Sequence, residues 1–260
     1  MPRHGLSLDH PPPTHVRTEA QIRDLLNLLG QVDTAAIDTE TTGLKISRDY
    51  VIFWSLSTGR DRYFLTHDQL PRFARVFGDP DRTWFGTNTK YDFHMLANSG
   101  QVLTGDMFDT LVMDRLVDSG RLLGLKESIE REFDEKVPTF GETFYPRDKK
   151  GKFKKPGKRK GMEHAPTMQE IITSTYDGSR AQAEWEEENK AREKQKKPPL
   201  TLDDLEAKKT EYQQNVVEYA TLDAWDAYRL ARVERTSTFL GSVSRALRSS
   251  SMVFWSIPST

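Results

Sequence analysis

The sequence lacks cysteine, an excess of either charge and any long apolar run. The absence of cysteine excludes a disulfide framework, a thiolate metal site and a cysteine nucleophile. Lys and Arg total 38 against 39 Asp and Glu, so the net charge of −1 creates no global field that attracts nucleic acid or a membrane. No segment approaches the ~18 consecutive apolar residues that a membrane-spanning helix requires. Any attraction to a polyanion must therefore come from local clusters of charge.

Charged residues make up 30% of the 260 residues and apolar residues 36%. Globular proteins typically contain about 25% charged residues. Part of this chain is therefore expected to be a solvated insertion or tail. Residues 1–17 are polar and rich in proline, carry no apolar signal core and are predicted to be disordered. We expect a soluble, cytoplasmic protein that does not bind membranes.

Apolar periodicity predicts a first helix that begins after Thr18 and ends at Gly30. Its apolar residues recur at i, i+3, i+4 and i+7 and form one stripe: Ile22, Leu25, Leu26 and Leu29. Thr is a common N-cap residue, and Gly commonly follows the last turn of a helix.

Short segments rich in β-branched and aromatic residues are then predicted as strands, over 34–39, 50–57 and 62–66. The gaps between them are short and favour antiparallel neighbours, because parallel neighbours need a crossover of about a dozen residues or more. A helix over 69–77 leads to a fourth strand, 83–86, and this longer connection allows a parallel arrangement. Further helices are expected over 92–98, 109–116 and 125–133. This order resembles a ribonuclease-H-like α/β fold, in which helices flank a mixed sheet of three antiparallel strands and additional parallel strands.

The middle of the chain differs in composition. Residues 147–160 contain nine Lys or Arg and one acid, whereas residues 184–197 carry charges of both signs at helical spacing. The basic run is either an arm that binds a nucleic-acid backbone or a solvated insertion, and the sequence leaves both open. A new helix is expected from Thr201 to about Val233. The last 25 residues, 236–260, contain eleven Ser or Thr, no acid and no clear structural pattern.

Two carboxylates close the first predicted strand, in the triplet Asp38-Thr39-Glu40. Residues i and i+2 of a strand point to the same face, so both carboxylates project from one side of the strand end. Two acids this close repel one another unless a cation lies between them, and such hard oxygen ligands suit Mg²⁺ or Mn²⁺. Taken alone, the triplet is also compatible with a solvated turn.

Two further motifs follow in order. Asn88 and Asp92 lie four apart after the fourth predicted strand, where Asp92 would either cap a helix or face the first two acids. Tyr219 and Asp223 lie four apart on the last predicted helix and share one face of it. A buried carboxylate is costly unless it is paired or binds a metal, although a core tyrosine beside an edge aspartate is the simpler interpretation.

The conjunction of the three motifs resembles the DEDD superfamily of 3′–5′ exonucleases, in its tyrosine-bearing branch. The nearest likeness is to the proofreading domain of family A DNA polymerases. Residues 108–111 and 122–129 also resemble the stretch between the second and third motifs of that family. The likeness extends over residues 18–235, interrupted by a charged insertion over about 140–199 that is longer than the family usually has there. The histidine-bearing branch places His five residues before the last Asp, where this chain has Glu218.

The resemblance implies a role for each residue. Asp38, Glu40 and Asp223 would hold one ion of Mg²⁺ or Mn²⁺, and Asp38 would bridge to a second ion that Asp92 supports. Tyr219 would orient the attacking water.

The resemblance also implies contacts with the nucleic acid. Asn88 and Tyr91 would contact the end of the substrate, and Leu44 would wedge against the terminal bases.

The resulting hypothesis is a metal-dependent 3′–5′ exonuclease with two metal ions. It would act on single-stranded or frayed DNA 3′ ends in replication or repair and release nucleoside 5′-monophosphates, with a polymerase domain or replication protein as partner. Two alternatives stay open: an exoribonuclease of the ribonuclease D or Werner type, which uses the same acids, and a catalytically silent nucleic-acid-binding module. Loss of a metal-binding acid is the usual mark of a silent module, and the chain has all four.

Overall fold

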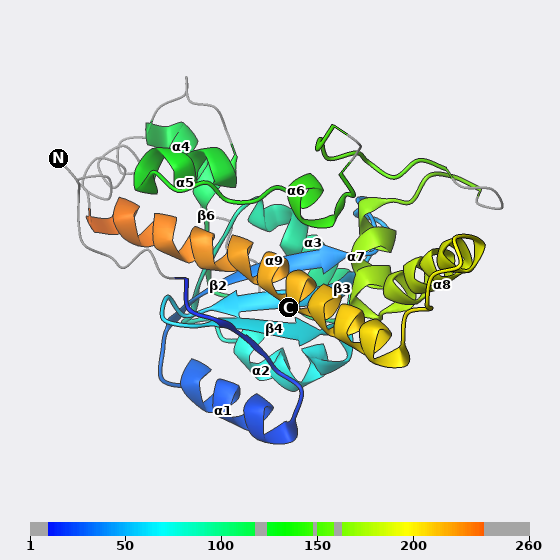
Figure 1. Cartoon of the computed structure of the whole chain (residues 1–260). Coiled ribbons are helices and arrows are strands. Elements are labelled where there is room, and N and C mark those ends of the chain that lie inside the picture. Colours follow the sequence, from blue (N-terminus) through cyan, green and yellow to red (C-terminus); the bar gives the residue numbers. More distant parts are fainter. Residues whose placement is uncertain (1–9, 118–123, 148–149, 159–162, 237–260) are drawn as a thin grey trace.

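A mixed sheet lies at the centre of the part of the chain that the computed structural model describes, namely residues 10–117, 124–147, 150–158 and 163–236 (Figure 1). Its strands are β1 (Pro13–His15), β2 (Thr34–Thr41), β3 (Val51–Ser57), β4 (Arg62–Thr66), β5 (Thr83–Gly86) and β6 (Asp106–Asp109). Their order across the sheet is β1-β4-β3-β2-β5-β6. Strand β3 runs antiparallel to both of its neighbours, β2 and β4, whereas β5 runs parallel to β2, β6 parallel to β5, and β1 parallel to β4. The predicted mixed α/β sheet is confirmed.

Helices cover both faces of this sheet. They are α1 (Glu19–Leu29), the 3₁₀ helix η1 (His67–Phe73), α2 (Ala74–Phe77), α3 (Thr89–Asn98), α4 (Thr110–Val117), α5 (Leu125–Phe133), α6 (Phe140–Phe144), α7 (Met168–Tyr176), α8 (Ser179–Lys194) and α9 (Leu202–Thr236). Figure 1 shows α9 lying across the strands, with α1 and α2 on the opposite side of the sheet. No helix of the described residues combines the length and the apolar character needed to cross a bilayer.

Alternation along β2 assigns its side chains to two cores. Ala35 and Ile37 are buried with Trp54 and Trp84 in the core beneath α1, η1 and α2. Ala36 is buried on the other face, against residues of α9 that include Ala224 and Ala227. Because side chains of a strand alternate, even-numbered residues of β2 point toward α9. This parity carries the strand's two acids to the α9 side.

The N-terminal segment is more ordered than its composition suggests. Residues 1–17 are predicted to be disordered, which is wrong for Pro13–His15, because they form β1 on the edge of the sheet beside β4. Proline is tolerated there, since an edge strand needs only one row of hydrogen bonds. The following Val16 is 2% exposed, and its N–H donates to the carbonyl of Phe64. Residues 1–9 of this predicted segment lie outside the described residues.

Most other elements match their predictions closely. Thr18 and Gln21 form a capping box at the start of α1, and β4, β5 and α5 have the predicted bounds. The helix expected over 69–77 is instead the 3₁₀ helix η1 followed by α2. The strand β6 precedes α4 where only a helix is expected, because four residues are too few to show a strand pattern. Residues 237–260 of the predicted tail lie outside the described residues.

The long insertion contributes to the fold. Its helices α6 and α7 place Phe144, Ile171 and Ile172 in a core with Val216 and Ala220 of α9. Helix α8 is mostly exposed and carries ion pairs within the helix, as its mixed charge predicts. The insertion therefore buttresses α9, the helix that carries the last predicted motif.

Candidate active site

The acids of the first motif lie at the end of β2, on the face that α9 covers. Pairing of β2 with β5 stops at Ala36 and Phe85, whereas pairing with β3 continues to the end of the strand. Asp38 and Glu40 therefore follow the point at which one edge of β2 becomes uncovered. Both side chains are half-buried.

Asp92 closes this uncovered edge from the first turn of α3. Its Oδ1 accepts the backbone N–H of Thr39 at 3.0 Å and the hydroxyl of Thr39 at 2.5 Å. Asp92 is 3% exposed. Thr39, which lies between Asp38 and Glu40, thus anchors Asp92 and brings it into the same site.

Asp92 does not cap the helix on which it lies. The N–H of Thr89 at the start of α3 donates instead to Asp109 Oδ2 at 2.8 Å. Asn88 occupies the N-cap position in a left-handed conformation, with φ of 59°, and its side chain makes no capping hydrogen bond. Of the two interpretations of Asp92, helix cap or cleft acid, the geometry agrees with the second.

The third motif reaches the site from α9. The ring of Tyr219 packs edge-on against Phe140 and Phe144 of α6, with centroid distances of 5.8 and 5.2 Å. On another side, the Nζ of Lys126 lies 5.1 Å from the centroid of the Tyr219 ring. Asp223 lies one turn further along the same face of α9. The tyrosine is therefore held between α5 and α6 next to the acids.

The carboxyl groups perturb one another. Burial raises the pKa of Asp38 well above its usual value, and repulsion from Asp92, Asp223 and Glu40 raises it further. Burial, followed by repulsion from Asp223 and Asp92, raises the pKa of Glu40 to about 8. Burial also raises the pKa of Asp223. Because repulsion from Asp92 and Asp223 acts on both Asp38 and Glu40, the four carboxyls lie near one another.

Two neighbours oppose this rise. For Asp92, burial raises the pKa to about 7, while the hydrogen bonds from Thr39 act in the opposite direction. Lys126 lowers the pKa of both Glu40 and Asp223. Burial also raises the pKa of the Tyr219 phenol, and Asp223 is its next largest influence, so Tyr219 stays protonated at neutral pH and keeps a proton to donate.

The donor set fits a hard divalent cation. Carboxylate oxygens are the ligands that Mg²⁺ and Mn²⁺ prefer, and four acids in one place create the negative potential that attracts them. Within the described ranges, no three Asp, Glu, His or Cys side chains are drawn together tightly enough to form a ready-made metal cluster.

The predicted substrate contacts lie around this acid cluster. Leu44 is 77% exposed on the loop after β2, and Asn88 is also exposed. Tyr91 differs, because its hydroxyl donates to the carbonyl of Gly43 at 2.6 Å and lies 2.6 Å from the Thr41 hydroxyl. The hydroxyl of Tyr91 therefore braces the loop that presents Leu44, and Tyr91 packs against the core that contains Trp54 and Trp84.

Two residues beside the acids are absent from the sequence-based set. Thr39 positions Asp92, and Lys126 is the cation that acts on Glu40 and Asp223. Thr39 was open to inference, since it lies between two predicted ligands. Lys126 lies in residues 122–129, a stretch that resembles the family but to which no role is assigned, and the packing of α5 against α9 brings it to the site.

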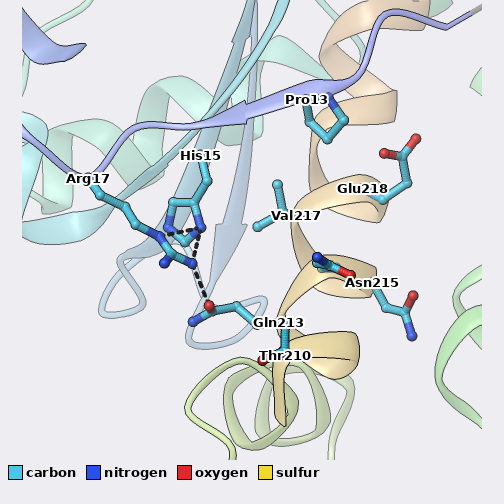
Figure 2. Close-up of a pocket in the computed structure, with 9 residues that line it drawn as sticks. Pro13, His15, Arg17, Thr210, Gln213, Asn215, Val217 and Glu218 are labelled. Atoms are coloured by element: carbon cyan, nitrogen blue, oxygen red, sulfur yellow. Dashed lines mark hydrogen bonds between the residues drawn. The ribbon is translucent and has the colours of Figure 1, made fainter. Parts of the chain in front are cut away.

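A separate pocket of about 660 Å³ lies between β1 and α9. Figure 2 shows Arg17 between His15 and Gln213, and Arg17 donates a hydrogen bond to each of them. Burial, together with Arg17, lowers the pKa of His15 to about 4. None of the predicted site residues lines this pocket, so it is distinct from the acid cluster.

Comparisons with known proteins show the family to which part of the chain is similar. A family profile described as 3′–5′ exonuclease, of the DNA polymerase A type, matches residues 13–145, which is just over half of the chain. The match includes Asp38, Glu40 and Asp92 and ends before α9. DNA polymerase I of Chloroflexus aurantiacus is 27% identical over 129 residues, which is 45% of this chain and 14% of that polymerase. The chain thus corresponds to a small part of this relative.

Solved structures show the same fold at low identity. The Aedes aegypti Nibbler EXO domain superposes with a TM-score of 0.51 and 14% identity, covering 95% of this chain and 98% of that one. Escherichia coli RNase D, described as an exoribonuclease involved in structured RNA processing, superposes with a TM-score of 0.50 and 17% identity. That superposition covers 90% of this chain and 48% of RNase D.

Proposed function

Since this chain belongs to the 3′–5′ exonuclease family, we propose that it hydrolyses the terminal phosphodiester bond at the 3′ end of single-stranded or frayed DNA. The reaction depends on divalent metal ions and releases nucleoside 5′-monophosphates. The observation that carries the proposal is the meeting of four mutually perturbed carboxyls and one tyrosine, from β2, α3 and α9, at one end of the sheet.

The four acids would hold two ions of Mg²⁺ or Mn²⁺, the first through Asp38, Glu40 and Asp223 and the second through Asp38 and Asp92. When bound, two such ions offset the charge that develops on the attacking and leaving oxygens of a phosphodiester. Thr39 keeps Asp92 in place through two hydrogen bonds.

The remaining side chains act directly on water and substrate. The raised pKa of Tyr219 keeps its phenol protonated, so the hydroxyl orients the attacking water by a hydrogen bond. Aromatic contacts from α6 hold the Tyr219 ring in place, which limits the entropy lost on reaching the transition state. The exposed Leu44 contacts the terminal base. An apolar side chain makes this contact with any base, so it does not select a sequence.

We propose DNA as the substrate. A DNA substrate implies a role in replication or repair, in which a polymerase would be the functional partner. The DNA polymerase A type of the matching family supports this choice. The same acids serve exoribonucleases, so the assay must separate the two substrates.

The test uses 5′-labelled single-stranded DNA and RNA of matched sequence, with Mg²⁺ or with EDTA. The expected result is a Mg²⁺-dependent ladder on DNA. Asp38→Asn should slow cleavage at least ~100-fold, because replacing even a residue that only supports a metal ligand lowers activity up to ~100-fold. Asp24→Asn, at an exposed position of α1, is the matched control. A faster ladder on RNA would establish the exoribonuclease, and tight binding without cleavage would establish a silent module.

A further inference from the structure

The chain between α6 and α7 carries the densest positive charge of the molecule. We define the basic arm as residues 146–147 and 150–158. Its charged residues are exposed and basic, namely Arg147, Lys150, Lys152, Lys154, Lys155 and Lys158, and the sequence between Arg147 and Lys150 contains one acid, Asp148. Figure 1 shows the chain projecting from the body of the protein between α6 and α7.

The start of the arm has a defined turn. Arg147 and Phe153 form an antiparallel bridge, and the Arg147 guanidinium lies 3.9 Å from the centroid of the Phe153 ring. The N–H of Lys154 donates to the carbonyl of Pro146 at 2.9 Å. Gly151 has a φ of +77°, which permits the reversal of the chain. The packed aromatic ring thus holds the base of the arm, and the lysine side chains of the arm are exposed.

The arm begins beside the candidate active site. It follows Tyr145 directly, and the ring of Tyr145 contacts Phe140 with a centroid distance of 5.7 Å. Phe140 and Phe144 are the residues that pack on Tyr219. One layer of aromatic side chains therefore separates the base of the arm from the tyrosine.

A nucleic-acid substrate needs a cationic surface close to this site. The four carboxyls repel a phosphate backbone, and the net charge of the whole chain is −1. The cations of α8 do not meet this need, because acids lie among them and Arg192, for example, pairs with Glu188. The arm carries six described Lys or Arg, and the sequence places one acid, Asp148, in the same stretch, next to the site where the strand must end.

We propose that the basic arm binds the sugar–phosphate backbone of the substrate strand, several nucleotides from its 3′ end. The proposal rests on the proposed exonuclease function. The chemistry that the arm recognises is the phosphodiester anion, which DNA and RNA share.

The arm reaches only strands of sufficient length. At ~3.3 Å a residue, Lys154 to Lys158 span at most about 13 Å, which corresponds to about four phosphates at the ~3.4 Å spacing of a B-form strand. A dinucleotide occupies the catalytic end alone and does not reach the arm. A longer strand gains the arm's ionic contacts, and its affinity should depend steeply on salt.

The experiment compares the full-length protein with two variants that lose the same charge. The arm variant carries Lys→Gln at positions 152, 154, 155 and 158, and the control carries Lys→Gln at positions 190, 194, 196 and 197, in and just after α8. Binding of labelled 20-nucleotide DNA and RNA strands is measured by fluorescence anisotropy in EDTA over a salt series. Cleavage of a dinucleotide and of the 20-mers is measured in Mg²⁺.

For four released counterions, the slope of log K against log salt should become less steep by up to ~2.8 in the arm variant. When salt rises from about 50 to 200 mM, both proteins should bind the 20-mers more weakly. The loss of affinity should be up to ~50-fold larger for wild type than for the arm variant. Dinucleotide cleavage by the arm variant should equal that of wild type, which shows that its active site is intact. The control variant should match wild type in every assay.

Equal salt slopes for wild type and the arm variant, with cleavage intact, would overturn the proposal and leave the exonuclease function standing. An equal loss in the control variant would also overturn it, because the effect would then follow net charge and not position. Absence of Mg²⁺-dependent cleavage in wild type would refute the proposed function instead. If the salt slope of the arm variant changed for DNA alone or for RNA alone, the arm would bind only that type of strand.

Discussion

Replacing Glu40 by Gln should stabilise the metal-free protein while removing its activity. Burial and repulsion from Asp223 and Asp92 raise the pKa of Glu40 from 4.5 to about 8. A carboxyl with a raised folded-state pKa holds a proton that the unfolded chain has lost, so the free energy of unfolding falls as pH rises from about 4.5 toward 8. The neutral amide of Gln does not carry this penalty.

The magnitude follows from the pKa shift. Each unit corresponds to about 1.4 kcal/mol, and the neighbouring acids share the repulsion, so we expect a gain of about 2–4 kcal/mol at pH 8. For a domain of this size, each kcal/mol raises Tm by about 2–4 °C, which predicts an increase of roughly 4–16 °C. At pH 5 the folded wild type already holds most of the proton, so the two proteins should melt within a few degrees of one another.

The assay is thermal unfolding in EDTA at pH 5 and pH 8, followed by far-UV circular dichroism. Glu211→Gln, at an exposed position on α9, is the control and should leave Tm unchanged at both pH values. Mg²⁺ should raise the Tm of wild type at pH 8 and raise that of Glu40→Gln less, because one ligand is missing. A Glu40→Gln protein that melts at or below the wild-type temperature at pH 8 would refute the idea that Glu40 is held in a repulsive acid cluster.

Three further substitutions test individual contacts. Tyr219→Phe should lower kcat by about 10- to 100-fold with little change in KM, because the ring still packs and only the hydroxyl is lost; an unchanged kcat would remove Tyr219 from the mechanism. Thr39→Val removes a hydroxyl bond to Asp92 and should raise the pKa of Asp92, so the pH at which half-maximal activity is reached should move upward; an unmoved profile would contradict the anchoring role. Arg62→Met removes the buried donor to the Pro11 carbonyl and to the half-exposed carboxylate of Glu218, and should cost about 1–3 kcal/mol in urea unfolding; an unchanged free energy of unfolding would show that these contacts are dispensable.

Sequence patterns were sufficient for elements whose local signal is strong. The stripe of α1 and its capping box lie within a dozen residues, and β4, β5 and α5 match their predicted bounds because each is a short run with clear ends. The strands β1 and β6 escaped prediction, since three or four residues show no period and their stability comes from the neighbouring strand.

The chemical identity of the candidate site was also present in the sequence. The spacing of Asp38 and Glu40 on a strand, and of Tyr219 and Asp223 on a helix, places each pair on one face whatever the rest of the fold does. Spacing alone cannot show that the pairs meet, and the expected roles of these residues in metal binding and catalysis remain predictions for the assays above.

Only the tertiary structure decided which groups surround the acids. In the folded chain, Asp109 accepts the N–H at the start of α3, and Asp92 accepts the N–H of Thr39. The hydroxyl of Tyr91 donates to the carbonyl of Gly43. The fold also brings Lys126 beside Glu40 and Asp223. The physical reason is that desolvation and Coulomb interactions depend on distance in space, whereas the propensities that shape helices and strands act between neighbours along the chain.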